Sequence, residues 1–269
     1  MALRLLSSNC QIYLPNTNHG RKASEILVTE GAEWYLDAEV DAYCFCLPRS
    51  EDVAECINQF APRVPVQMFD FSTGDPLRAG ELAGQASASG SLYFDCPVSG
   101  SSVQAASGML TMWIGSAENN ATTLCHEVVD KLSSRRFWMG ACGAGFSAKL
   151  VNQVVHILNV AAIGEGLKVA DALELPRELI IESLKSSSAA SAMLDRFGSA
   201  IAAGDHSTQF RLELAAKDIE YVVEALSPRV RDGLPYLRDL RQDLNKAISR
   251  GLQDKNFTCF VDGNDRVMD

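Results

Sequence analysis

The stretch Gly143-Ala-Gly-Phe-Ser-Ala-Lys-Leu-Val-Asn152 marks the point where the sequence changes its pattern. From Ala148 to Leu173 apolar residues fall on nearly every side of a helix, and the pattern ends before Pro176. A helix that is apolar all round is buried, either in a core or between domains. We therefore expect one long buried helix that opens an all-α region at residue 143.

Before this helix, short apolar runs alternate with amphipathic helical segments. Strand, helix and strand in short alternation indicate a parallel α/β sheet. The expected strands lie within Gln11–Leu14, Asp41–Leu47, Val64–Phe71, Leu92–Asp95 and Leu110–Ile114. The expected helices are Lys22–Glu30, Glu51–Phe60 with Ser50 as its cap, and one that opens at Asp75-Pro76.

After the long helix, the sequence predicts further helices at about 177–186, 189–203, 209–226 and 233–250. The predicted fold class is therefore α/β plus all-α. Residues 1–142 would form a doubly wound parallel sheet, and residues 143–269 would form a helical domain.

The composition narrows the class of protein. The chain has 269 residues, is 47% hydrophobic and carries a net charge of −10, which disfavours a nucleic-acid partner. Neither a signal peptide nor a run of 18 apolar residues is visible, so no membrane partner is expected. Eight cysteines without zinc spacing predict reduced, buried thiols in a cytoplasmic protein, and no metal site.

The long helix carries polar side chains at a spacing that suits a site. Lys149, Asn152 and His156 stand at i, i+3 and i+7 and so share one helix face. A buried lysine is costly unless it is used, and burial lowers its pKa toward the range of proton transfer. A lysine that extends its amine to water is the alternative, and the spacing alone does not separate the two. For His156 a core position is favoured.

Two further segments carry candidate chemistry. A strand ends at Pro97, and the following Ser99, Gly100 and Ser101 offer amides and hydroxyls at its carboxyl end. Such groups can bind a carboxylate, although an ordinary serine–glycine loop has the same composition. Lys217-Asp218 lies in an amphipathic helical pattern and taken alone indicates a solvated charge pair.

Taken together and in order, these segments resemble the β-hydroxyacid dehydrogenase family, which includes 3-hydroxyisobutyrate dehydrogenases and 6-phosphogluconate dehydrogenase-like proteins. The resemblance implies an N-terminal Rossmann domain, an all-α domain and a homo-oligomer paired through the α-domains. The matching motifs are Leu47-Pro48, Phe71-Ser-Thr73 with Pro76, Asp95-Cys-Pro-Val-Ser-Gly100, Gly108-Met-Leu-Thr111, Gly143–Asn152 and Lys217-Asp218.

The resemblance also implies a role for each candidate residue. Lys149 would be catalytic and would contact the substrate hydroxyl while hydride passes to or from the nicotinamide of NAD or NADP. The substrate would contact Ser99, Gly100, Ser101 and Asn152. The cofactor would contact Leu47, Pro48, Asp52, Thr73 and Lys217. The expected activity is oxidation of a small β-hydroxyacid such as 3-hydroxyisobutyrate. The alternatives are reduction of a small aldehyde acid of the succinic semialdehyde type, and a catalytically silent binding or scaffold protein.

The sequence departs from the family pattern at its start. The family begins with a strand and Gly-x-Gly-x-x-Gly, whereas Met1-Ala2 aligns with the Met-Ala that follows those glycines. An internal start site and a real short form both explain this, and we favour the first because the catalytic-type residues are present. Leu14–Asn18 holds neither the acid typical of NAD binding nor an arginine, although Arg21 and Lys22 follow.

Overall fold

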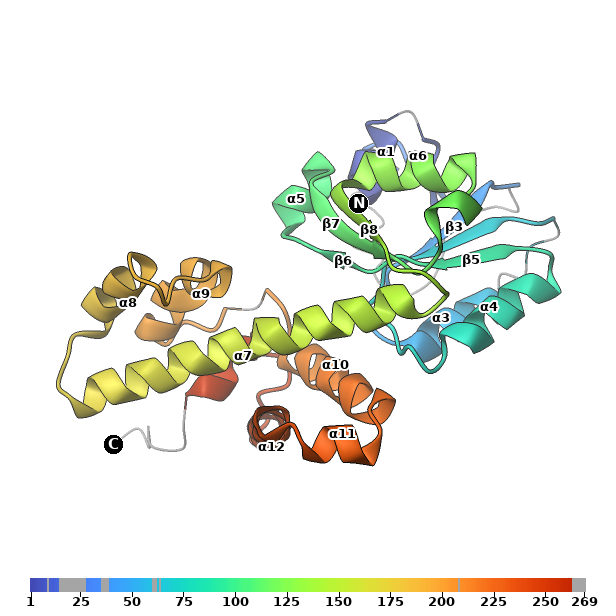
Figure 1. The fold of residues 1–269 in the computed structure, drawn as a ribbon. Helices are drawn as coiled ribbons and strands as arrows, with labels where there is room; N and C mark the ends of the chain where they lie inside the picture. Colours follow the sequence, from blue (N-terminus) through green and yellow to red (C-terminus); the bar gives the residue numbers. More distant parts are fainter. Residues whose placement is uncertain are drawn as a thin grey trace. The chain divides into compact units, whose positions relative to one another are not determined.

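The computed structural model describes residues 1–8, 10–14, 28–34, 39–59, 62, 64–207 and 209–262. It forms two compact units, Met1–Lys149 and Leu150–Asp269 (Figure 1). The units divide inside helix α7 (Ala144–Ala172), a little after the predicted boundary at residue 142. Most of the predicted helix Lys22–Glu30, and the residues expected to distinguish NAD from NADP, lie outside the described residues.

The first unit is built on parallel strands. Three of them form a sheet in the order β3-β4-β5, and the carboxyl ends of β4 and β5 are in register, with Asp70 opposite Asp95. A second sheet has the order β6-β7-β8, in which β6 is antiparallel and β8 parallel to β7. A short parallel pair, β1-β2, completes the described strands. The strands are β1 (Tyr13–Leu14), β2 (Glu33–Trp34), β3 (Ala42–Phe45), β4 (Gln67–Asp70), β5 (Leu92–Asp95), β6 (Val98–Ser99), β7 (Leu110–Ile114) and β8 (Ser133–Trp138).

Alternate residues of the central strands pack into two different cores. Met68 and Tyr93 join the cluster with Leu82 of helix α4, whereas Phe69 and Phe94 join a cluster with residues of helix α6. Because side chains alternate along a strand, this split means that both faces of the sheet are covered. The predicted doubly wound α/β arrangement is thus confirmed. The helices of this unit are α1 (Ala2–Leu6), α3 (Ser50–Gln59), α4 (Ala79–Ala88), α5 (Ser102–Ser107) and α6 (Thr123–Leu132).

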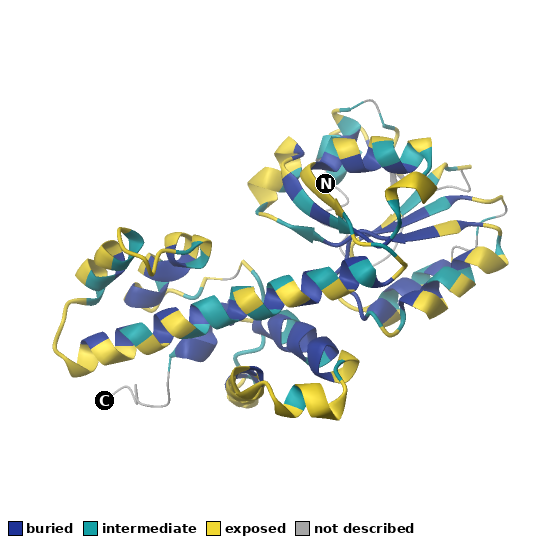
Figure 2. Cartoon of the chain, viewed as in Figure 1, coloured by how far each residue is buried: buried dark blue, intermediate teal, exposed yellow. Residues whose placement is uncertain are grey.

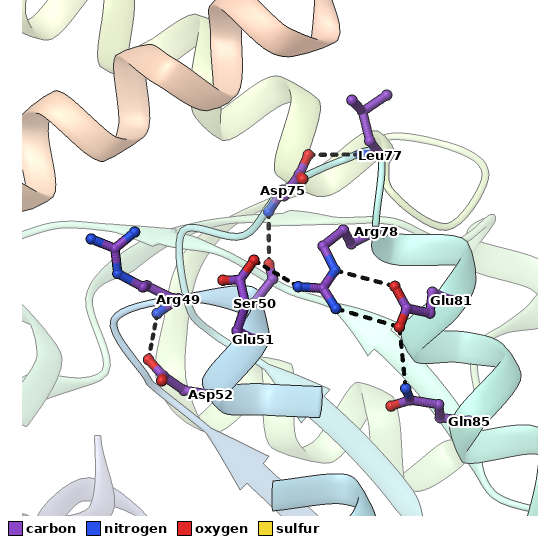
Figure 3. Close-up of polar contacts among 9 residues, drawn as sticks. All are labelled: Arg49, Ser50, Glu51, Asp52, Asp75, Leu77, Arg78, Glu81 and Gln85. Carbon is purple, nitrogen blue, oxygen red and sulfur yellow. Dashed lines mark hydrogen bonds and ion pairs between the residues drawn. The ribbon is translucent and has the colours of Figure 1, made fainter. Parts of the chain in front are cut away.

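Two predicted helix starts need correction, and both concern the segment drawn in Figure 3. Helix α4 begins at Ala79 rather than at Asp75-Pro76, because Asp75 Oδ1 accepts a hydrogen bond from Leu77 N (2.9 Å) and holds a turn there. Helix α3 includes Ser50 itself, and the Ser50 hydroxyl accepts from Asp75 N (2.9 Å). The two helix starts are therefore joined to each other.

The second unit is all-α, as predicted. Its helices are α7, α8 (Arg177–Lys185), α9 (Ala192–Ala203), α10 (Leu212–Ala225), α11 (Pro228–Asp232) and α12 (Pro235–Ser249), followed by the 3-10 helix η2 (Phe257–Val261). Helix α12 corresponds to the predicted helix at 233–250, whereas α11 lies between two predicted helices and was missed; a proline opens each of them. A single β-bridge, Arg211 to Asn256, is the only strand-like pairing among the described residues of this unit.

Helix α7 is less buried than its sequence predicts. Leu150, Ile157, Val160 and Leu167 lie in the core of the second unit. The opposite side is exposed in this single chain (Figure 2), and its apolar members are Val151, Val155 and Val169, which are 57–67% exposed. By length and composition alone α7 could cross a membrane, but its buried side packs as the core helix of a globular unit does.

The cysteines also differ in part from the prediction. All eight are free, as expected for reduced thiols. Cys44, Cys46 and Cys142 are exposed, so the prediction that the thiols are buried is wrong for these three. Cys44 and Cys46 belong to the apolar run at β3, and their exposure shows that an apolar run does not by itself bury every member.

Candidate active site

Helix α7 starts at a buried carboxylate. Asp95, which ends β5 and is fully buried, accepts hydrogen bonds from Gly143 N at Oδ1 and from Phe146 N at Oδ2, both 2.9 Å long. The first amides of a helix have no partner inside the helix and carry a partial positive charge. Asp95 therefore closes the N-terminus of α7 with a carboxylate from a neighbouring strand.

Phe146 fixes the first turn of α7 from another side. Its ring is fully buried, in the cluster that also holds residues of α3 and α4. A Cβ at Gly74 would lie 2.5 Å from the ring, so the loop after β4 approaches Phe146 as closely as a glycine allows. One residue thus joins α7 to Asp95 through its amide and to the β4 loop through its ring.

Lys149 follows one turn later, and it is buried. It is 8% exposed, and its amine lies 6.0 Å from the ring centre of Trp113 on β7. This position rules out the alternative in which the lysine extends its amine into water. A cation facing an aromatic ring gains electrostatic attraction that partly offsets the cost of burial.

The same sheet face also carries Ser99. Ser99 of β6 is directly opposite Thr111 of β7, and Trp113 is two residues further along β7. Register partners and residues two apart share one face of a sheet, so Ser99, Thr111 and Trp113 point to the same side. Since the Lys149 amine lies over Trp113, the structure brings Lys149 and Ser99 to one face of this sheet.

The residues after Ser99 have local tasks in the loop. Gly100 has a φ of +150°, and a Cβ there would lie 2.7 Å from Leu110 Cδ2, so glycine is required twice over. Ser101 caps α5: its hydroxyl accepts from Gln104 N (3.2 Å), and its own amide donates to Gln104 Oε1 (2.8 Å). Contact of Ser101 with a substrate stays a prediction, because both of these groups already have a partner.

Leu47, Pro48 and Thr73 follow the carboxyl ends of β3 and β4, the edge at which ligands bind in open α/β sheets. Leu47 N donates to Ser72 Oγ (2.9 Å), which ties the two loops together. The uncharged side chains of Leu47, Pro48 and Thr73 suit the neutral parts of a nucleotide. The residues present therefore fit the uncharged parts of a dinucleotide.

Asp52 lies beside this edge at the start of α3. Its Oδ2 accepts a hydrogen bond from Arg49 N (3.0 Å), and the residue is half-buried (Figure 3). Arg78 pairs with Glu51 (2.6 Å) and Glu81 (3.1 Å), joining the starts of α3 and α4. The structure thus gives Asp52 a role in its own helix start, and its contact with a cofactor stays a prediction.

In the second unit, two hydrogen bonds and one ion pair connect Asn152 to Lys217. Asn152 Nδ2 donates to Gln153 Oε1 (3.2 Å), and Gln153 Nε2 donates to Asp218 Oδ2 (2.7 Å). Asp218 Oδ1 pairs with Lys217 Nζ (3.1 Å), which also lies 4.9 Å from the Tyr221 ring centre. Lys217 and Asp218 are buried, so the expectation of a solvated charge pair is wrong.

Sequence reasoning missed Gln153, and it did not show that Asp218 is buried and contacts α7. The signal for Gln153 was present, because it stands at i+4 from Lys149 and so shares that helix face. No local pattern could show that Asp218 pairs with Gln153, because the two residues lie 65 positions apart. His156, for which a core position was favoured, is half-buried, and its ring lies 5.2 Å from that of Phe257.

Comparison with known proteins agrees with this geometry. Residues 1–140 match the model of the NAD-binding domain of 6-phosphogluconate dehydrogenase, and residues 143–262 match the NAD-binding model of NADP-dependent 3-hydroxyisobutyrate dehydrogenase. The chain belongs to the β-hydroxyacid dehydrogenase family. As a family member it is an NAD(P)-dependent oxidoreductase of the hydroxyacid dehydrogenase class.

Individual β-hydroxyacid dehydrogenase relatives are distant. The chain is 26% identical over 217 residues to an uncharacterized oxidoreductase of Synechocystis, covering 78% of this chain and 73% of that protein. It is 27% identical over 239 residues to the 2-(hydroxymethyl)glutarate dehydrogenase of Eubacterium barkeri, covering 84% and 77%. A solved 3-hydroxyisobutyrate dehydrogenase of Salmonella typhimurium has the same fold, with a TM-score of 0.86 and 21% identity over 97% of this chain and 93% of that one.

The stability of this β-hydroxyacid dehydrogenase is expected to depend on pH through the carboxyl group of Asp95. Burial raises the pKa of Asp95 from 3.8 to about 6, against the opposing effect of the Gly143 and Phe146 amides. Between these two values the native state binds more protons than the unfolded chain, so the free energy of unfolding falls as the pH rises. A shift of this size corresponds to about 3 kcal/mol.

Asp95→Asn removes this titration. The unfolding free energy of wild type minus that of the variant, measured by urea denaturation at about pH 4 and pH 7, should fall by about 2 kcal/mol as the pH rises. A difference that stays constant across this range would show that Asp95 titrates normally.

Proposed function

We propose that the chain oxidises a small β-hydroxyacid, such as 3-hydroxyisobutyrate, with NAD or NADP, and that Lys149 is the catalytic residue. The single observation that carries this proposal is the Lys149 amine. It is buried on a helix whose start is fixed by Asp95 and Phe146, and it lies on the sheet face that also carries Ser99.

The proposed roles follow from the chemistry of the groups. NAD or NADP, when bound, accepts the hydride or donates it. In the oxidation Lys149 Nζ, as the neutral amine, accepts the proton of the substrate hydroxyl, because an alcohol that loses hydride must also lose its hydroxyl proton. In the reduction the ammonium group returns this proton to the oxygen. Ser99, Gly100 and Ser101 are proposed to bind the substrate carboxylate, and Asn152 is proposed to hold the substrate or to orient Lys149. Leu47, Pro48, Asp52, Thr73 and Lys217 are proposed to border the cofactor.

The substrate class is tested by a panel of reactions. Reduction of NAD and of NADP is followed with 3-hydroxyisobutyrate, 3-hydroxypropionate and 2-(hydroxymethyl)glutarate. The reverse reaction is followed with succinic semialdehyde and each reduced cofactor. We expect turnover with at least one β-hydroxyacid, and a preference for succinic semialdehyde would favour the reductase alternative.

A silent binding or scaffold protein predicts a different result. NAD(P)H binding, measured by fluorescence titration, would then be weak or absent, and no member of the panel would be turned over. This outcome would overturn the proposed activity without contradicting the family membership, because a fold can persist after its catalysis is lost.

We further propose that a second copy of the chain covers the exposed side of α7, as the pairing of α-domains in the family implies. Val151 and Val155 lie one turn apart on that side. The double variant Val151→Glu/Val155→Glu should dissociate to the 29.2 kDa monomer, because two carboxylates in an apolar interface are costly. Light scattering with size-exclusion chromatography measures this, and a wild type that is itself monomeric would refute the proposal.

A further inference from the structure

The start of α7 has the form of an anion site. Strand β8 is followed by Gly143 and then by α7, whose first residues are Ala-Gly145-Phe-Ser-Ala148. In dinucleotide-binding folds a glycine-rich segment between a strand and a helix binds phosphate at the helix start. In those turns the helix amides meet a phosphate oxygen, and the glycines let the oxygen approach the backbone. Here the amides of Gly143 and Phe146 meet the Asp95 carboxylate instead.

Two glycines leave room for the Asp95 carboxylate. A Cβ at Gly145 would lie 2.8 Å from Asp95 Oδ2, and a Cβ at Gly115 would overlap the carboxylate itself. Neither glycine has a positive φ. These positions therefore require glycine because the Asp95 carboxylate lies so close to the backbone that a Cβ would not fit. This turn of the chain is therefore filled by the protein's own carboxylate and is not available to a dinucleotide phosphate.

Asp95 also lies between two elements that carry proposed site residues. It ends β5, and the next residues lead through Pro97 to β6 and Ser99. It therefore connects the strand that leads into the Ser99–Ser101 loop with the helix that carries Lys149. A shift of this helix start by one ångström would move the Lys149 amine by a similar amount, because less than two helical turns separate them.

We infer that Asp95 is a positioning residue for Lys149: its carboxylate fills the anion-binding start of α7 and fixes the lysine helix to the strand end that leads into the Ser99–Ser101 loop. The catalytic consequence rests on the proposed function, whereas the structural link does not. Asp95 itself touches no substrate in this scheme and acts through the helix.

Asp70 provides a matched control. It is in register with Asp95 on the neighbouring strand and is equally buried. Its carboxylate accepts from Tyr93 OH (2.7 Å) and Ser72 N (2.9 Å), both of which lie outside α7. Loss of Asp70 should therefore cost stability without loosening the start of α7.

The first measurement needs no catalysis. Asp95→Gly removes the carboxylate and leaves the two amides facing a cavity that formate can enter. The thermal midpoint of Asp95→Gly should rise saturably with sodium formate relative to sodium chloride, whereas the midpoint of wild type, in which the Asp95 carboxylate fills this position, should respond to the two salts alike. Equal responses of Asp95→Gly and wild type would overturn the inference.

The second measurement reports on Lys149 directly. The rate of lysine acetylation by acetic anhydride, resolved by peptide mass spectrometry, should rise severalfold at Lys149 in Asp95→Gly and return toward the wild-type rate with formate. Lys217, which is similarly buried but lies in the other unit, is the internal control and should not change. An unchanged rate at Lys149 would overturn the positioning role even if formate stabilises the protein.

Kinetics complete the test. Asp95→Gly should lower kcat, by up to about 10²-fold, with a small change in the KM for the cofactor, and formate should restore kcat. A wild type that turns over no substrate would refute the proposed function but leave the acetylation result standing. If Asp95→Gly does not fold, Asp95→Asn takes its place, and equal Lys149 acetylation in Asp95→Asn and Asp70→Asn would overturn the inference.

Discussion

Replacing Lys149 with methionine is expected to lower kcat by about 10²–10⁴-fold, the usual contribution of a group that transfers a proton in the transition state. Methionine is similar in length and apolar, so it should fill the position beside Trp113. The fold and the affinity for NAD(P)H should therefore stay near those of wild type. Steady-state kinetics and cofactor titration measure the two effects separately.

Lys168→Met on the same helix is the matched control for this prediction. Lys168 is exposed and pairs with Glu165 (2.7 Å), so its loss should change kcat by less than about twofold. A Lys149→Met enzyme with the activity of the Lys168→Met enzyme would show that Lys149 is a structural lysine, and that the proton moves through another group.

Replacing Phe146 with alanine is expected to produce the largest loss of stability, about 3–5 kcal/mol, the usual cost of deleting a fully buried phenylalanine. The deletion removes the ring that packs against Gly74 and leaves a cavity at the first turn of α7. Urea denaturation gives the free energy of unfolding. A loss below about 1 kcal/mol would mean that this part of the core collapses around the change.

Phe137→Ala is the control for Phe146→Ala. Phe137 lies on β8 and is 49% exposed, so the same substitution should change the unfolding free energy by only about 0.5 kcal/mol. Because both variants delete the same side chain, the difference between them isolates burial from the chemistry of the residue.

Strands and helices could be predicted from the sequence where a clear apolar run or period marked them. The strands Leu92–Asp95 and Leu110–Ile114 were predicted at their observed bounds, because each is a compact apolar run next to a turn. Strand β8 was missed, because Arg135, Arg136 and their neighbours are exposed and no apolar alternation marks it. The start of α5 could have been predicted, since Ser101 and Gln104 have the spacing of a capping box.

The exposed side of α7 could not be predicted from its sequence. Nearly every face of this helix is apolar, so the pattern cannot show which side the chain itself covers. The core of the second unit covers Leu150, Ile157 and Leu167 and leaves Val151 and Val155 open. That choice depends on the packing of helices that are distant in the sequence.

The sequence by itself determined the class of fold, the order of the motifs and the place of Lys149 near the start of a long helix, because apolar period and turn chemistry are local properties. Only the tertiary structure decided that Lys149 is buried beside Trp113, that Asp95 closes α7 from 48 residues away, and that Gln153 reaches Asp218. These contacts join residues far apart in the chain. They form only when the strands and helices pack, so no local pattern announces them.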